Sequence, residues 1–156
     1  MKNKTSSLEL SHFPVMLNEV LKISSPFAGC KFVDCTFGGG SYTKEILKIP
    51  NTNVSAFDRD KHALKLAKNL ERKFPGRFKF YQSRFSHVSN LINHNVDAVI
   101  FDLGLSSIQL NDLNRGFSFK SNKKLDMSMG LNKITALEVI NNLSEKNLKK
   151  VIKFLG

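Results

Sequence analysis

The chain has 156 residues, enough for one domain of common size. It carries 24 lysine and arginine residues against 13 acidic residues, so its formal charge is +11. This balance favours a polyanionic partner, although scattered lysines on a solvated surface would give the same total. Cys30 and Cys35 are too few for a disulfide framework, and the polar start runs into no long apolar block. We therefore expect a reduced, cytoplasmic protein without a membrane span.

Residues 1 to about 11 are polar, and we expect them to be loosely held. A helix is predicted from Pro14, because proline suits the first helical turn and the next residues place apolar side chains on one face. Those side chains are Val15, Leu17, Val20 and Leu21. Pro26 and Gly29 end the segment.

A strand, a glycine loop and a helix follow between residues 31 and 43, and the rest of the chain is organised around them. The strand ends at Asp34, the glycines are Gly38, Gly39 and Gly40, and the helix starts at Ser41. Glycine suits such a loop because some positions need a positive φ, and because a side chain would hold the backbone away from a ligand. The acid before the glycines suits a ligand with a positive group, such as S-adenosylmethionine. A glycine-rich turn without a ligand is the alternative.

The second predicted strand, residues 54–58, places Asp58 at its carboxyl end. A carboxylate there can accept two hydrogen bonds from the vicinal hydroxyls of a ribose. The alternative is a turn acid that caps the next helix, whose apolar residues begin at Ala63. Asp60 is better placed for that cap, so we expect Asp58 to be free for a ligand.

Two further strands are predicted, at residues 78–81 and 96–102, with a short helix at about 88–92 between them. Phe85 follows the third strand and is either one wall of an adenine pocket or ordinary core. The fourth strand is apolar on both faces, as in a covered parallel sheet, and ends at Asp102. Ligands of open α/β sheets bind beyond the carboxyl ends of the strands, where these side chains would converge.

Strand–helix alternation stops after about Ser107. Residues 111–124 are loop-like, and two helices are predicted at 135–143 and 144–155. We expect a Rossmann-like α/β cofactor-binding part over residues 1–110 and the start of a helical, substrate-recognising insertion over residues 111–156. The fourth strand needs a second neighbour that nothing after Ser107 supplies, so the later strands of the sheet are expected to be missing.

These residues resemble the amino-terminal half of the RsmH (MraW) family, the S-adenosylmethionine-dependent methyltransferases that modify N4 of a cytidine in small-subunit (16S) ribosomal RNA. The resemblance runs from about His12 to the end and rests on six motifs. They are His12-Phe-Pro-Val-Met-Leu17, Asp34-Cys-Thr-Phe-Gly-Gly-Gly40, Phe57-Asp-Arg-Asp60, Asp102-Leu-Gly-Leu-Ser-Ser-Ile-Gln-Leu110, Arg115-Gly-Phe-Ser-Phe119 and Leu125-Asp-Met127.

The resemblance implies that S-adenosylmethionine is the cofactor and that small-subunit ribosomal RNA, or the small ribosomal subunit, is the partner. The implied cofactor-binding residues are Gly40, Ser41, Tyr42, Asp58, Phe85, Asp102 and Gln109. The family usually has glycine where this chain has Ser41, and charged residues where it has Ser128 and Gly130. Family members also continue well past this point, so we expect a truncated methyltransferase with little activity alone.

Methyl transfer to an exocyclic amine requires the nitrogen to lie in line with the sulfonium–methyl bond. Asp102 can accept the hydrogens of the amino group as a catalytic residue, or it can contact the cofactor as the family suggests. No metal site is expected, because the four histidines are scattered. Two rival functions remain open: a methyltransferase of the same fold acting on a small molecule or protein, and a non-catalytic RNA-binding fragment. The sequence does not determine the oligomeric state.

Overall fold

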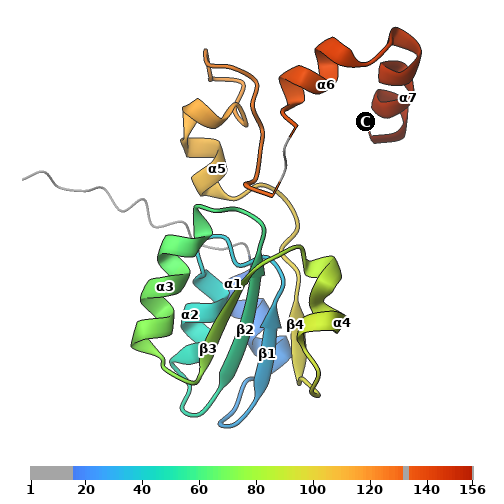
Figure 1. Ribbon diagram of the computed structural model, residues 1–156. Helices are drawn as coiled ribbons and strands as arrows, with labels where there is room; N and C mark the ends of the chain where they lie inside the picture. Colours follow the sequence, from blue (N-terminus) through green and yellow to red (C-terminus); the bar gives the residue numbers. More distant parts are fainter. Residues whose placement is uncertain (1–15, 132–133, 156) are drawn as a thin grey trace, which may run out of the picture.

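The computed structural model describes residues 16–131 and 134–155. A four-stranded parallel sheet in the order β3-β2-β1-β4 forms its centre (Figure 1). The strands are β1 (Lys31–Asp34), β2 (Asn53–Asp58), β3 (Phe78–Gln82) and β4 (Ala98–Ile100). The Rossmann-like parallel sheet predicted from the sequence is confirmed, and β1 lies between β2 and β4.

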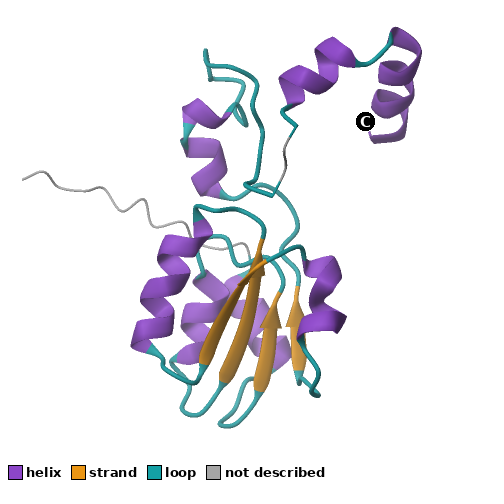
Figure 2. Ribbon diagram, in the orientation of Figure 1, coloured by secondary structure: helices purple, strands orange, loops and turns teal. Residues whose placement is uncertain are grey.

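One face of the sheet packs against three helices (Figure 2). They are α1 (Leu17–Ser24), α2 (Ser41–Leu47) and α3 (Ala63–Lys73). In α3, the buried residues Ala63, Ala67 and Leu70 recur at helical spacing, so one stripe of the helix joins the core. The predicted start of the first helix at Pro14 and the polar residues before it lie outside the described residues.

The opposite face of the sheet holds a smaller core of Val33, Cys35 and Phe57. It packs against α4 (Val88–Leu91), which follows the 3-10 turn η1 (Phe85–His87). The prediction that the fourth strand is covered on both faces is wrong, because Val99 and Phe101 are about half exposed. Val88 of α4 packs against the small core of Val33, Cys35 and Phe57. Within the described sheet, β4 pairs only with β1.

Helix α5 (Ser107–Asn111) and the 3-10 turn η2 (Leu113–Arg115) follow β4, in a stretch whose later part was expected to be loop. Ser106 and Gln109 form a capping box that starts α5, since each side chain accepts a hydrogen bond from the other residue's backbone N–H. Helices α6 (Ala136–Asn142) and α7 (Glu145–Leu155) confirm the two predicted terminal helices. Both extend away from the sheet beyond the carboxyl ends of its strands (Figure 1).

Candidate functional site

The glycine loop between β1 and α2 has a backbone that only glycine adopts easily. Gly38 has φ +50° and Gly40 has φ +71°, in the left-handed region. A Cβ on Gly40 would lie 2.7 Å from the buried ring of Phe37, whereas a Cβ on Gly39 would meet nothing within 4 Å. The predicted need for positive φ is therefore confirmed. A side chain at Gly40 would collide with Phe37 of the protein itself, whereas the space beside Gly39 is empty and accessible to a ligand.

Asp34 lies at the end of β1 but does not face an open surface. Its carboxylate is fully buried and accepts hydrogen bonds from the Thr43 hydroxyl at 2.6 Å and the Thr36 N–H at 3.2 Å. The pKa of Asp34 is raised from 3.8 to about 6, chiefly by burial and to a lesser extent by the charges of Asp58 and Asp102, against the opposing effect of the two hydrogen bonds. Asp58 at the end of β2 and Asp102 after β4 therefore both lie within electrostatic reach of Asp34, as predicted for this edge of the sheet.

Asp58 is half buried and holds the glycine loop against β2. Its Oδ2 accepts a hydrogen bond from the Gly38 N–H at 2.7 Å, and its Oδ1 accepts one from the Asp60 N–H at 2.8 Å. Asp58, which was expected to be available to a ligand, therefore also has a structural role in the loop. Burial raises the pKa of this carboxyl against the opposing effect of the two hydrogen bonds. A carboxylate offers about four acceptor sites, so each oxygen retains capacity for a further donor such as a ribose hydroxyl.

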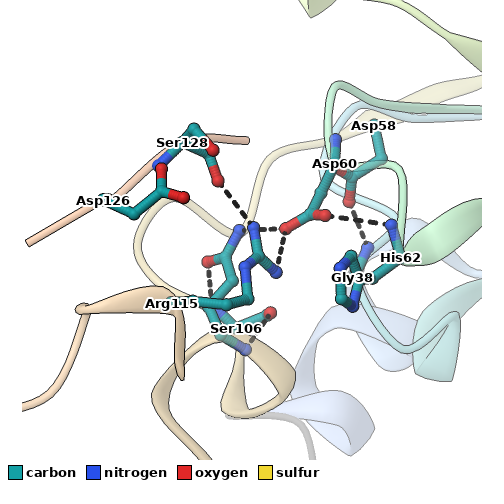
Figure 3. A network of polar contacts seen from close by, with 9 residues as sticks. Gly38, Asp58, Asp60, His62, Ser106, Arg115, Asp126 and Ser128 are labelled. Carbon is teal, nitrogen blue, oxygen red and sulfur yellow. Dashed lines mark hydrogen bonds and ion pairs between the residues drawn. The ribbon is translucent and has the colours of Figure 1, made fainter. Parts of the chain in front are cut away.

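Asp60 is the centre of a buried polar network rather than a simple helix cap (Figure 3). Its Oδ1 accepts a hydrogen bond from the His62 N–H at 3.0 Å. Its Oδ2 accepts one from the Gln109 side-chain amide at 2.9 Å and forms an ion pair with Arg115 at 2.7 Å. Burial alone would raise the pKa of Asp60, but the donors His62, Gln109 and Arg115 together lower it. The residue first expected to cap α3 thus joins the sheet to the chain after residue 110.

Arg115 continues this network into the next segment of the chain. Its guanidinium donates a hydrogen bond to the Ser128 carbonyl at 2.8 Å and lies over the ring of Phe117, 5.1 Å from the ring centroid. The Arg115 carbonyl also accepts a hydrogen bond from the Met127 N–H at 2.9 Å. Residues 115–128 are therefore anchored to the loop that follows β2 (Figure 3).

Asp102 follows β4 and is exposed. Its backbone N–H donates a hydrogen bond to the Thr36 hydroxyl at 2.7 Å, which fixes the chain after β4 to the glycine loop. The buried phenol of Tyr42 has a raised pKa, caused first by burial and then by the charge of Asp102 and a hydrogen bond to it. Two of the residues expected in the cofactor site, one from α2 and one from the chain after β4, are thereby brought into contact.

The remaining expected site residues occupy three different positions. Phe85 is exposed, with its ring edge-on to Phe101 at a centroid distance of 5.5 Å, so it lies outside the buried core of the described residues. Ser41 is the half-buried first residue of α2. Gln109 is buried, and both ends of its side-chain amide are engaged by Ser106 and Asp60.

A small hollow with a volume of about 10 Å³ lies where these elements meet. Its lining residues include Gly38, Asp58, Asp60, Ser106 and Ile108. It is smaller than the roughly 300–1,000 Å³ of typical ligand pockets, so a nucleoside-sized ligand would also extend over the open carboxyl edge of the sheet. Within the described residues no group of histidine, cysteine and acidic side chains could hold a metal ion. No helix in the same ranges is long and apolar enough to cross a bilayer.

The sequence profile of the MraW methylase family matches residues 9–156. This chain belongs to that family. The match includes the glycine loop, the residues that end β1, β2 and β4, and the segment anchored by Arg115. The resemblance expected from the motifs is thereby confirmed.

Relatives of this MraW-family chain are named "Ribosomal RNA small subunit methyltransferase H". The protein from Anaplasma phagocytophilum is 42% identical over 153 residues, which cover 94% of this chain and 52% of the relative. The protein from Ehrlichia canis is 43% identical, with 90% and 49% coverage, and that from Rickettsia africae is 43% identical, with 91% and 47% coverage. The chain therefore spans about half the length of the curated relatives it matches.

A solved structure assigned to an rRNA-methylase from Clostridium thermocellum superposes on this MraW-family chain with a TM-score of 0.52. The two are 23% identical, and the match covers 60% of this chain and 53% of the other. At this identity the likeness supports the fold alone.

Two functional features of this MraW-family chain were missed from the sequence. The capping box at Ser106 and Gln109 was readable, because serine followed three residues later by glutamine is a helix-start signature. The ion pair between Asp60 and Arg115 was not readable. A buried arginine must be paired, but the sequence does not reveal that Arg115 is buried or which of the acidic residues lies beside it.

Proposed function

We propose that this chain is the cofactor-binding part of an S-adenosylmethionine-dependent methyltransferase that modifies N4 of a cytidine in small-subunit (16S) ribosomal RNA. The observation that carries the proposal is the convergence of Asp34, Asp58 and Asp102 around the glycine loop, in a member of the MraW methylase family. The relatives' names supply the class of substrate. Because rRNA is the proposed substrate, we also infer a cytoplasmic location.

The residues at the carboxyl edge fit a nucleoside with a charged tail. Asp58 has acceptor capacity left for ribose hydroxyls, and the exposed ring of Phe85 can form one wall for an adenine. Gly40, Ser41 and Tyr42 line the start of α2, and Gln109 closes the side toward α5. When bound, S-adenosylmethionine would supply the electrophilic methyl group.

Asp102 is the candidate for orienting the amino group that is methylated. Its carboxylate is exposed beyond β4, and Thr36 and Tyr42 hold the backbone and the side chain in place. An acceptor for the amino hydrogens favours localisation of the nitrogen lone pair, which is otherwise delocalised into the cytosine ring. Alignment of that nitrogen at near-attack distance is the main contribution that the protein can make.

The division of the chain at residue 110 stays part of this proposal. Residues 111–156 would begin the part that recognises RNA, while the contacts of Arg115 fix its first segment to the cofactor side. In the full-length protein, both parts would be completed by chain beyond the half that this sequence spans.

Two titrations test the proposed function. Calorimetry with S-adenosylmethionine should show binding, and a 16S rRNA fragment should bind with an affinity that falls as salt rises, by about 0.7 in log–log slope per phosphate contact. Binding of the cofactor without salt-dependent RNA binding would favour a methyltransferase for small molecules or proteins. RNA binding without cofactor binding would favour a non-catalytic RNA-binding protein, and either result would overturn the proposal.

A further inference from the structure

Residues 116–125 form a projecting loop, here named the Phe119 loop. In Figure 1 it rises beside α5, away from the sheet and beyond the carboxyl ends of the strands. Its base is closed by the hydrogen bond from the Met127 N–H to the Arg115 carbonyl and by the close packing of Gly116 on Lys124. A Cβ on Gly116 would lie 2.8 Å from the Lys124 carbonyl, so the two arms of the loop are in contact.

The tip of the loop has a defined conformation. The Ser121 N–H donates to the Ser118 carbonyl at 2.9 Å, and the Ser121 hydroxyl donates to the Leu113 carbonyl. Ser121 Oγ also accepts from the Lys123 N–H at 3.1 Å, and Ser118 Oγ accepts from the Lys120 N–H at 3.2 Å. A loop held in this way loses little conformational entropy when a ligand binds to it.

Two phenylalanines of this loop have opposite environments. Phe117 exposes only 9% of its surface and packs beneath the guanidinium of Arg115. Phe119 exposes 111% of its reference area, so its ring has no packing role within the described structure. A single exposed apolar side chain is ordinary on a protein surface, and the charge around this one is what distinguishes it.

The Phe119 loop is purely basic. Residues 116–125 contain three lysines and no acidic residue, and all three lysines are exposed. They are Lys120, Lys123 and Lys124. An exposed aromatic ring among cationic side chains matches the way in which proteins bind single-stranded nucleic acid, with a base stacked on the ring and phosphates near the cations.

We propose that Phe119 stacks on an unpaired base of the RNA substrate, and that the lysines of the Phe119 loop bind the adjacent phosphates. This inference rests on the proposed function, since it takes an RNA as the ligand. Arg115 pairs with Asp60 just after β2, so the loop is fixed beyond the edge where the cofactor residues gather. An enzyme that modifies a base must reach it outside a helical stack, and a stacking platform near the site holds such a strand.

The test compares three ligands with the same length of phosphate chain: a single-stranded oligocytidylate of about 12 nucleotides, an RNA duplex and inorganic polyphosphate. Phe119→Ala should weaken binding of the oligocytidylate about 5- to 150-fold, as expected for loss of one stacked base, and leave polyphosphate binding unchanged. Phe119→Trp should retain the affinity. Replacement of all three lysines by serine should weaken the binding of every ligand. For the single strand it should also reduce the slope of log affinity against log salt concentration by up to about 2.

Phe154→Ala is the matched control, because Phe154 is an exposed phenylalanine on α7, outside the Phe119 loop. It should leave all three affinities unchanged. The stacking proposal is overturned if Phe119→Ala binds the oligocytidylate with wild-type affinity. It is also overturned if this variant loses as much affinity for polyphosphate as for the oligocytidylate, or if Phe154→Ala weakens oligocytidylate binding to the same extent. If the wild-type chain binds none of the three ligands, the proposed RNA substrate itself fails, which is a different result.

Discussion

Arg115 and Asp60 form a buried ion pair between two segments that are far apart in the sequence. The distance from Arg115 Nη1 to Asp60 Oδ2 is 2.7 Å, and the two side chains expose only 10% and 6% of their surface. The Asp60 N–H in turn donates to Asp58, and Asp58 accepts from the Gly38 N–H in the glycine loop. A continuous chain of polar contacts therefore joins the segment after α5 to the loop that is proposed to bind the cofactor.

Breaking this ion pair should destabilise the protein strongly. Arg115→Met leaves the Asp60 carboxylate buried without its cation, so we expect a loss of about 3–5 kcal/mol in the free energy of unfolding. Urea denaturation measures it. The matched control is Lys149→Met, which breaks the exposed pair with Glu145 on α7 and should cost at most about 0.5 kcal/mol. Equal, small losses in both variants would show that the Asp60–Arg115 pair does not hold the two segments together.

Asp58 should be required for cofactor affinity. Asp58→Ala removes acceptors for two ribose hydroxyls, and hydrogen bonds to a charged group are worth roughly 1.5–3 kcal/mol each. Calorimetric titration with S-adenosylmethionine should show this loss, provided that circular dichroism finds the variant folded. Because Asp58 also accepts hydrogen bonds from the Gly38 and Asp60 N–H groups, part of the loss would come from loosening of the glycine loop. Unchanged affinity in a folded variant would refute the ribose assignment.

Gly40 should tolerate substitution much less well than its neighbour Gly39. Gly40→Ala forces a non-glycine residue to φ +71° and brings Cβ to 2.7 Å from the Phe37 ring. The backbone conformation alone costs about 1–2 kcal/mol, and displacement of the buried ring adds to it. Gly39→Ala is the control, because its Cβ would meet nothing within 4 Å. Thermal unfolding of both variants checks the difference, and similar melting temperatures would contradict it.

The buried carboxyl of Asp34 should make stability depend on pH. Its pKa is raised from 3.8 to about 6, so between about pH 4 and 6 the folded protein binds this proton more tightly than the unfolded chain. This contribution is fully present below about pH 4 and is lost as the pH rises through about 6. Each unit of pKa corresponds to about 1.4 kcal/mol, so the total is about 2–3 kcal/mol.

Asp34→Asn isolates that contribution, because the amide carries no titrating proton and can still bond with Thr43. We compare the free energy of unfolding of Asp34→Asn minus that of wild type at the two pH values. This difference should be about 2–3 kcal/mol larger at pH 7 than at pH 4. Denaturant unfolding of both proteins at the two pH values gives this difference. A difference that does not vary with pH would show that Asp34 titrates as an ordinary surface carboxyl does.

The parallel sheet and the helices on its first face could be predicted from the sequence because their signals are local. Alternating strand and helix patterns placed Asp34, Asp58 and Asp102 beyond neighbouring strands, and the structure confirms this order. The terminal helices α6 and α7 were predicted in the same way. Periodicity and caps depend on residues within a few positions of one another, so one sequence is enough to read them.

The tertiary structure alone decided which polar groups are already paired. Asp60 was expected to cap α3, and in the structure it also pairs with Arg115. Asp58 was expected to be available to a ligand, and it already accepts two backbone hydrogen bonds. Whether Phe85 and Phe119 are exposed is likewise invisible in the sequence, where each is one more phenylalanine. These outcomes depend on how distant segments meet, and a buried charge must find its partner in space rather than along the chain.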